Sequence, residues 1–147
     1  MLLPPLEQKV YGCGVISDSA GNVGSSRANQ RVALVAEDEW IVLMEIAETL
    51  ISAGWTVREA DTAESALEIL VADPSIRVLI TDIRFGGGMD GWELAAEGRK
   101  ISPTLGVVYV TANEKVAEAM VPGAVFLGKP CLATVIVTQA ERLWDHV

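Results

Sequence analysis

Five polar residues stand directly after apolar runs of this chain, and their types suit phosphate chemistry. They are Glu37, Asp38, Asp82, Thr111 and Lys129. In an open parallel sheet, ligands bind at the carboxyl ends of the strands, so we expect these side chains to converge on one edge. Neighbouring carboxylates repel one another unless a cation joins them, and hard oxygen ligands suit Mg²⁺. An ammonium and a hydroxyl beside them can hold an anion, so the set predicts a site for a phosphoryl group on a carboxylate.

Each of these features has a plainer explanation when it is taken alone. An acidic pair such as Glu37-Asp38 favours the first turn of a helix. Thr111 could be an ordinary N-cap, and a carboxylate at Asp82 needs some partner because it follows an apolar run. Lys129 precedes Pro130, and X-Pro bonds adopt the cis form where a tight turn demands it. The order and spacing of the whole set therefore carry the interpretation.

Alternating strands and helices must position these residues. Gly54 marks the end of the first helix, and Asp61 or Thr62 is the expected cap of the second. Five strand–helix units in about 115 residues predict an α/β fold with a doubly wound five-stranded parallel sheet. We expect strands at 31–36, 56–60, 77–81, 106–110 and 124–128, and helices near 39–53, 62–72, 90–100, 113–120 (short and weak) and 131–144.

The composition of the chain excludes several classes of protein. A net charge of −9 over 147 residues argues against nonspecific nucleic-acid binding. Half of the residues are hydrophobic, which allows a normal core. The apolar runs are too short for a transmembrane helix and the N-terminus lacks a signal peptide, so we expect a cytoplasmic protein without a membrane partner. Cys13 and Cys131 are too few for a disulfide framework or a metal cluster.

Residues 1–30 differ in composition from the rest of the chain. Glycine and serine punctuate them without any sustained period, which is typical of a flexible extension. A start codon assigned too far upstream is an equally plain explanation. Their charges cancel, so all of the excess negative charge lies in residues 31–147, which we expect to form the single globular domain.

The ordered motifs resemble the receiver domain of two-component response regulators. The resemblance covers about residues 31–145, and it is specific because separate motifs occur in the family's order. It implies a flavodoxin-like (βα)5 fold with strand order 2-1-3-4-5. The loop after Asp82 is one residue longer than usual, a feature similar to that of alphaproteobacterial receivers that stand alone or are attached to histidine kinases. The matching segments are Val35–Glu39, Leu79–Ile83, Met89–Gly91, Val110–Ala112 and Gly128–Pro130.

The resemblance implies a phosphoacceptor and a metal site. Asp82 would be the phosphoacceptor, with its carboxylate as the nucleophile. Glu37 and Asp38 would hold Mg²⁺ together with Asp82 and the main-chain carbonyl of Arg84. The loop Phe85-Gly86-Gly87-Gly88 lacks the usual Met-Pro, and its glycines make the Arg84 carbonyl harder to place.

The same resemblance implies a switch around the phosphoryl group. Thr111 would contact this group and move with it, and Lys129 would pair with its oxygens. Phe126 stands three residues before Lys129, where the family carries the aromatic residue that turns inward on activation. Asn113 replaces a charged residue often found two positions after Thr111, which leaves the hydrolysis rate open.

The resulting hypothesis is a single-domain response regulator. It would accept a phosphoryl group from a sensor histidine kinase or a histidine phosphotransfer protein, and it would catalyse only its own phosphorylation and aspartyl-phosphate hydrolysis. No output domain follows residue 147, so we expect the signal to leave by contact with an effector protein. One rival is a phosphorylation-independent pseudo-receiver adaptor. Another is a haloacid-dehalogenase-like phosphatase, which needs an aspartate where this chain has Arg84.

Two helices offer apolar side chains beyond what a core needs. On the first, Leu43, Ile46, Ala47 and Leu50 form the predicted core stripe, whereas Trp40, Ile41 and Met44 lie off it as a predicted partner surface. Scattered exposed apolar residues are the alternative. The last helix carries two apolar stripes. They are either one broad core-facing stripe, or a core stripe beside a homodimer or effector surface. The first stripe is Leu132, Val135, Ile136 and Leu143, and the second is Ala133, Val137, Ala140 and Trp144.

Overall fold

A single parallel sheet forms the centre of the protein, whose computed structural model describes residues 30–112 and 119–145. The strand order is β2-β1-β3-β4-β5, and every neighbouring pair is parallel. This arrangement confirms the predicted doubly wound fold and its order 2-1-3-4-5. The strands are β1 (Val32–Ala36), β2 (Thr56–Ala60), β3 (Val78–Thr81), β4 (Gly106–Thr111) and β5 (Val125–Gly128).

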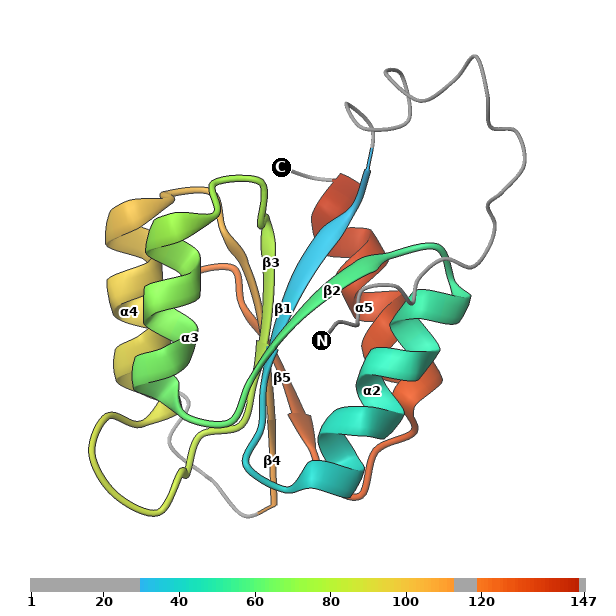
Figure 1. Cartoon of the computed structure of the whole chain (residues 1–147), viewed down its shortest axis with the longest axis horizontal. Coiled ribbons are helices and arrows are strands. Elements are labelled where there is room, and N and C mark those ends of the chain that lie inside the picture. Colours follow the sequence, from blue (N-terminus) through green and yellow to red (C-terminus); the bar gives the residue numbers. More distant parts are fainter. Residues whose placement is uncertain (1–29, 113–118, 146–147) are drawn as a thin grey trace, which may run out of the picture.

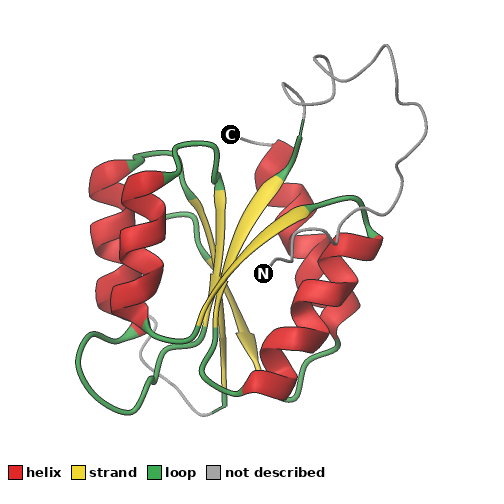
Figure 2. Ribbon diagram, in the orientation of Figure 1, coloured by secondary structure: helices red, strands yellow, loops and turns green. Residues whose placement is uncertain are grey.

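Helices cover both faces of the sheet. Helices α2 (Trp40–Ser52) and α5 (Ala133–Asp145) lie on one face, and α3 (Ala63–Ala72) and α4 (Gly91–Ile101) lie on the other (Figures 1 and 2). The helix expected near 113–120 falls mostly on residues 113–118, which lie outside the described residues. Within the described ranges, no helix is both long enough and apolar enough to cross a membrane.

The core consists of two hydrophobic clusters, one on each side of the sheet. Leu34, Leu79 and Tyr109 point toward α3 and α4, whereas Val35 and Ile80 point toward α2 and α5. Strands β1, β3 and β4 are buried along their whole length, but β2 and β5 are partly exposed. Continuous apolar runs are expected for central strands of a parallel sheet because helices cover both of their faces.

The helix faces follow the sequence pattern. The buried residues of α2 are the predicted stripe of Leu43, Ile46, Ala47 and Leu50. In α5 the buried residues are Ala133, Ile136, Val137 and Ala140, drawn from both predicted stripes. One broad stripe of α5 therefore faces the core, and Leu132 and Val135 remain exposed beside it.

Local signals mark the ends of three helices. The Thr62 hydroxyl accepts a hydrogen bond from Ser65 N at 3.0 Å, so Thr62 is the N-cap of α3. Asp90 caps α4 through a capping box with Glu93. Gly54, with φ of 96°, follows the C-cap of α2 and donates to Ile51 O at 3.0 Å.

Candidate functional site

The buried polar and charged residues of the described structure gather at one end of the sheet. Glu37, Thr81, Asp82 and Thr111 are each at most 9% exposed. They end or follow β1, β3 and β4, at the carboxyl ends of these strands. The strand order reverses between β1 and β3, and this switch point is where ligands bind in open α/β sheets. The structure thus brings the predicted residues to one edge.

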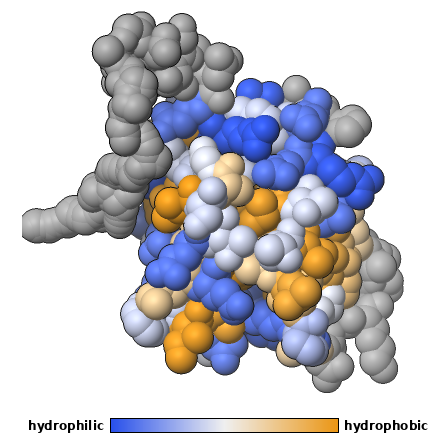
Figure 3. All heavy atoms as spheres, turned by 90° about the vertical axis from the view of Figure 1, so that its right-hand side faces the viewer, coloured by the Kyte–Doolittle hydropathy of each residue, from blue (hydrophilic) through white to orange (hydrophobic). Residues whose placement is uncertain are grey.

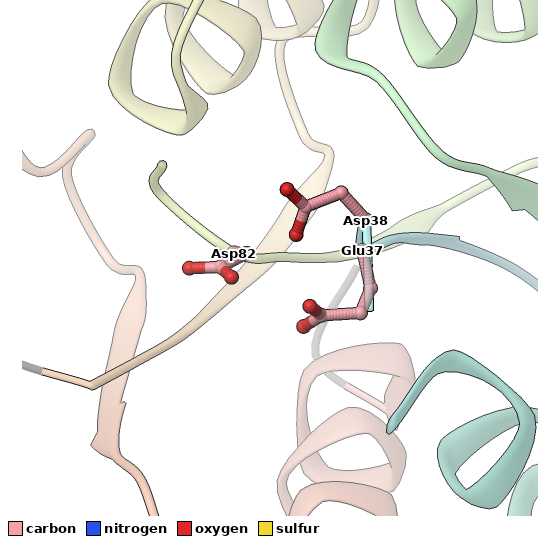
Figure 4. A group of neighbouring side chains, drawn as sticks. All are labelled: Glu37, Asp38 and Asp82. Atoms are coloured by element: carbon pink, nitrogen blue, oxygen red, sulfur yellow. The ribbon is translucent and has the colours of Figure 1, made fainter. Parts of the chain in front are cut away.

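Three carboxylates form a compact acidic cluster at this edge. One oxygen from each of Glu37, Asp38 and Asp82 lies within 4.8 Å of the others. The side chains of the consecutive residues Glu37 and Asp38 leave the chain in different directions, while Asp82 approaches from the neighbouring strand (Figure 4). Glu37 is buried and Asp38 is exposed. The cluster therefore has a buried side and a side open to solvent.

Lys129 closes the buried side of the cluster. It follows β5, and its Nζ lies 3.0 Å from Glu37 Oε1 and 3.2 Å from Asp82 Oδ2. The Lys129 main-chain N donates to Thr111 O at 2.8 Å, and the Lys129–Pro130 peptide bond is cis. One ammonium thus bridges the carboxylates that follow β1 and β3, and it balances part of their negative charge.

Main-chain donors hold the Asp82 carboxylate from its other side. Its Oδ1 accepts hydrogen bonds from Ile83 N at 2.6 Å and from Arg84 N at 3.4 Å. Asp82 N donates to Ala36 O at 3.0 Å, which anchors the residue to the end of β1. One carboxylate oxygen is therefore held by the chain itself, while the other faces Lys129.

Burial and neighbouring charges perturb two of these groups. Burial is the largest effect at Glu37 and raises its pKa from 4.5 to about 7, with a smaller contribution from the negative charge of Asp82. The Glu39 N–H, 3.1 Å from Glu37 Oε2, and Lys129 oppose this rise. Burial lowers the pKa of Lys129, but bonding and attraction to Glu37 and Asp82 outweigh it and leave that pKa raised.

The donor set at this edge fits a hard divalent cation. Mg²⁺ prefers oxygen ligands and is usually bound through one or two carboxylates together with water and phosphate oxygens. The exposed carboxylate of Asp38 and that of Asp82 offer such ligands, and the cluster supplies enough negative charge. Glu37 is already bonded to Lys129 and Glu39 N, so it is placed to support the site from the buried side. The main-chain carbonyl of Arg84 belongs to the loop that begins at Asp82.

The predicted switch residue Phe126 lies in an aromatic group. Its ring stacks on Trp92 with centroids 6.3 Å apart, and Trp92 lies 4.7 Å from the ring of Tyr109. The Tyr109 hydroxyl accepts a hydrogen bond from Val121 N at 3.2 Å. Phe126 is half-buried, on the strand that leads to Lys129. The aromatic group links α4, β4 and β5. Asn113 lies outside the described residues.

The predicted partner surface is exposed. Trp40, Ile41 and Met44 are 67%, 71% and 38% exposed, and all three belong to the first half of α2, next to the acidic cluster.

Sequence reasoning missed other residues at the site. Glu39 Oε1 lies 3.8 Å from Lys129 Nζ, and Thr81 donates from its hydroxyl to the carbonyl of Asp82 at 2.6 Å.

The only sequence signals for Glu39 and Thr81 were their positions, next to the acidic pair and next to Asp82. Trp92 in the aromatic group and Glu64 near the loop after β3 were missed as well. Both depend on contacts between elements far apart in the sequence, which no local motif predicts.

Comparisons with known proteins agree with this fold. The chain matches the response regulator receiver domain over residues 33–141. A response regulator receiver protein from Sinorhizobium medicae WSM419 is 31% identical, with a TM-score of 0.77, and the match covers 80% of this chain and 97% of that one. The receiver domain of the hybrid histidine kinase CckA is 28% identical, with a TM-score of 0.66 and coverage of 76% and 97%.

A receiver domain protein from Clostridium thermocellum is 27% identical, with a TM-score of 0.72 and coverage of 79% and 95%. A search of the curated proteins found no match. The family match spans well over half of the chain, so this protein belongs to the response regulator receiver domain family. Receiver domains act in two-component phosphorelays, interact with histidine kinases or phosphotransfer proteins, and bind Mg²⁺ at an acidic pocket.

Proposed function

We propose that this chain accepts a phosphoryl group onto Asp82 in a Mg²⁺-dependent phosphorelay, as a single-domain response regulator. The donor is a phosphohistidine on a sensor histidine kinase or a histidine phosphotransfer protein, and the output is contact with an effector protein. The observation that carries this proposal is the position of Lys129 Nζ, 3.0 Å from Glu37 and 3.2 Å from Asp82, within the buried acidic edge. A cation and an acidic cluster around one carboxylate suit phosphoryl transfer to that carboxylate.

Several residues at this edge have separate roles in the transfer. An Asp82 oxygen attacks the phosphorus, the bond between phosphorus and the histidine nitrogen breaks, and the electron pair leaves with the imidazole. Ile83 N and Arg84 N hold Oδ1 in place, which orients the carboxylate for attack. Asp38, Asp82 and the Arg84 carbonyl would hold Mg²⁺ with support from Glu37, and the ion would supply charge neutralisation.

Lys129 and Thr111 respond to the product. Once Asp82 carries the phosphoryl group, the Lys129 ammonium pairs with a phosphoryl oxygen, because it already lies 3.2 Å from Asp82 Oδ2. The Thr111 hydroxyl at the end of β4 contacts the same group. Thr111 ends the strand that carries Tyr109, and Lys129 follows the strand that carries Phe126. The stacking of these rings with Trp92 gives the change a route toward α4. Water then hydrolyses the acyl phosphate and resets the site.

The exposed part of α2 is the proposed docking surface for the phosphohistidine partner. Trp40, Ile41 and Met44 lie beside the phosphorylation edge, and Leu132 and Val135 are exposed at the start of α5. Figure 3 views the protein from the side of α2 and α5, where hydrophobic groups alternate with hydrophilic ones. An aromatic residue within such a surface is a common binding hot spot. A homodimer through α5 is the alternative use of Leu132 and Val135.

Labelling with a small phosphodonor such as acetyl phosphate tests the proposed function. We expect the full chain to gain one phosphoryl group in millimolar Mg²⁺ and none in chelator. We also expect Mg²⁺ to raise the melting temperature, because binding relieves carboxylate repulsion. A pseudo-receiver adaptor would show no labelling under either condition, and that result would overturn the proposal. A variant comprising residues 31–147 should label equally well if this range is the working domain.

A further inference from the structure

The loop between β3 and α4 contains three consecutive glycines in the left-handed region. Gly86, Gly87 and Gly88 have φ values of 80°, 147° and 72°. The space around the Cα atoms of Gly86 and Gly87 is open, because a Cβ there would meet nothing within 4 Å. Glycine has the largest conformational freedom of any residue, so this stretch needs restraints from elsewhere to keep one shape.

The base of the loop is closed tightly on Asp82. Gly91 N donates to Ile83 O at 2.7 Å, across the start and the end of the loop. A Cβ on Gly91 would collide with the carbonyl oxygen of Asp82 and would lie 2.8 Å from Ile83 Cα. Only glycine therefore allows α4 to begin so near the phosphoacceptor. These contacts fix both ends of the loop, and Phe85 and Met89 pack against the core on either side of the three glycines.

A second restraint comes from the first turn of α3. Glu64 Oε2 accepts a hydrogen bond from Met89 N at 2.7 Å. Gly88 approaches the same carboxylate so closely that a Cβ on it would collide with Oε2 and would lie 3.3 Å from Glu64 Cδ. The Met89 N–H is the main cause of the lowered pKa of Glu64, so this carboxylate stays ionised at neutral pH. One charged group thus holds the far side of the glycine loop.

We propose that Glu64 is a positioning residue for the phosphoacceptor loop. By holding Met89 and the adjoining Gly88, it limits the conformations of residues 84–88 and keeps Arg84, whose N–H donates to Asp82 Oδ1, beside the phosphoacceptor. Glu64 is not part of the acidic cluster of Glu37, Asp38 and Asp82. The inference deepens the proposed function and rests on it, because it assigns the control of metal affinity to a residue on another helix.

The expected effect is moderate because Glu64 is exposed. Without the tether, metal binding must order the glycine stretch itself, and that entropy loss weakens binding. One exposed hydrogen bond contributes enough to change the Mg²⁺ dissociation constant by about three- to tenfold. Melting in chelator should change little, since no core contact of Glu64 is lost.

Paired variants of the full chain separate the tether from general damage. Glu64→Ala removes the acceptor, and Glu64→Gln keeps an amide oxygen that can accept from Met89 N. Glu68→Ala is the matched control, an exposed glutamate one turn further along α3. Gly88→Ala should mimic Glu64→Ala by pushing the carboxylate away. Its control is Gly86→Ala, which has similar backbone strain but open space around it.

Three measurements decide the outcome. Hydrogen exchange should show faster exchange at the Met89 amide in Glu64→Ala, but not in Glu68→Ala. Calorimetric titration with Mg²⁺ alone should give the weaker binding for Glu64→Ala and Gly88→Ala, with recovery in Glu64→Gln. Labelling by acetyl phosphate at subsaturating Mg²⁺ should slow in parallel.

Unchanged Mg²⁺ affinity in Glu64→Ala, together with faster Met89 exchange, would overturn the positioning role. Unchanged exchange at Met89 would overturn the tether itself. A wild-type chain that binds Mg²⁺ but is never labelled would instead overturn the proposed function, and the affinity comparison would still test Glu64.

Discussion

The two ends of the sheet differ in the side chains that pack there. At the carboxyl end, Glu37 and Asp82 are buried with Lys129 between them. At the amino end, Arg77 lies 4.2 Å from the centroid of the Trp144 ring, and the Trp55 and Trp144 rings meet edge to face at 5.7 Å. One end buries charged groups, and the other covers aromatic surface with an arginine.

This difference indicates separate tasks for the two ends. Burying carboxylates costs stability, which their partners offset only in part, so such groups persist where chemistry uses them. Aromatic rings with an arginine over them contribute hydrophobic burial and cation–π attraction without a charged interior. We therefore expect substitutions at the carboxyl end to change phosphorylation more than stability, and substitutions at the amino end to do the reverse.

The largest effect should come from Lys129→Met, which removes the ammonium at the carboxyl end. Labelling by acetyl phosphate should slow by about 100-fold, because a charged group that stabilises developing phosphoryl charge is lost. Mg²⁺ binding should persist, since the carboxylates remain. Stopped-flow labelling and calorimetry measure the two quantities, and a rate within about threefold of wild type would exclude a role for Lys129.

At the amino end, Trp144→Ala should lower the free energy of unfolding by about 2 to 3 kcal/mol. The ring packs on Trp55 and lies under Arg77, and both contacts are lost. Labelling of the folded variant should stay within about twofold of wild type, because the ring lies at the opposite end from Asp82. Urea unfolding and labelling check this pair of outcomes. Slow labelling in a folded Trp144→Ala variant would contradict the assignment of separate tasks to the two ends of the sheet.

The titration of Glu37 should make metal binding depend on pH. Its pKa is raised from 4.5 to about 7, so protons compete with Mg²⁺ at the cluster. Below about pH 7, affinity should fall by up to tenfold per pH unit. The direction in which stability changes with pH follows from the same pKa shift. The metal-free protein should lose stability as pH rises from 4.5 to about 7, since the folded state favours protonated Glu37.

Glu37→Gln is the control for this titration. The variant should lose the stability change between pH 5 and pH 8 that belongs to Glu37, and its Mg²⁺ affinity should depend less on pH. Calorimetry and urea unfolding across this range provide the test. Identical pH profiles for Glu37→Gln and wild type would show that another group controls the cluster.

The smallest expected effect belongs to the exposed surface beside the carboxyl end. Trp40→Ala should slow transfer from a cognate phosphohistidine donor by about fivefold to tenfold, since a large aromatic side chain leaves the interface. Labelling by acetyl phosphate should not change, because Trp40 is 67% exposed and lies outside the pocket. The matched control is Val71→Ala on α3, which is 66% exposed on the other face. Equal slowing in both assays would assign Trp40 to the pocket or the fold rather than to docking.

Local patterns in the sequence predicted the strands and the gathering of Glu37, Asp38, Asp82, Thr111 and Lys129, whereas the strand order was implied by the resemblance to the receiver family. Apolar runs mark buried strands, and the residue after each strand must lie at its carboxyl end. The core stripe of α2 was predicted correctly for the same reason, since helical periodicity alone defines it.

Contacts between distant segments could not be predicted in this way. The tether from Glu64 to Met89 depends on how α3 packs beside the loop, and the Trp55–Trp144 pair depends on how α5 ends. The two apolar stripes of α5 merged into one core-facing stripe because the sheet and α2 determine its rotation. No spacing in the sequence carries that information.

The central claim is that Asp82 receives the phosphoryl group. Intact-mass analysis and peptide mapping after acetyl phosphate treatment in Mg²⁺ test it most directly, with Asp82→Asn as the variant that keeps the shape and removes the nucleophile. We predict one hydroxylamine-sensitive acyl phosphate on the wild-type peptide that contains Asp82, and none anywhere in Asp82→Asn. A phosphorylated Asp82→Asn chain, or an acyl phosphate at another residue of the wild type, would contradict the account.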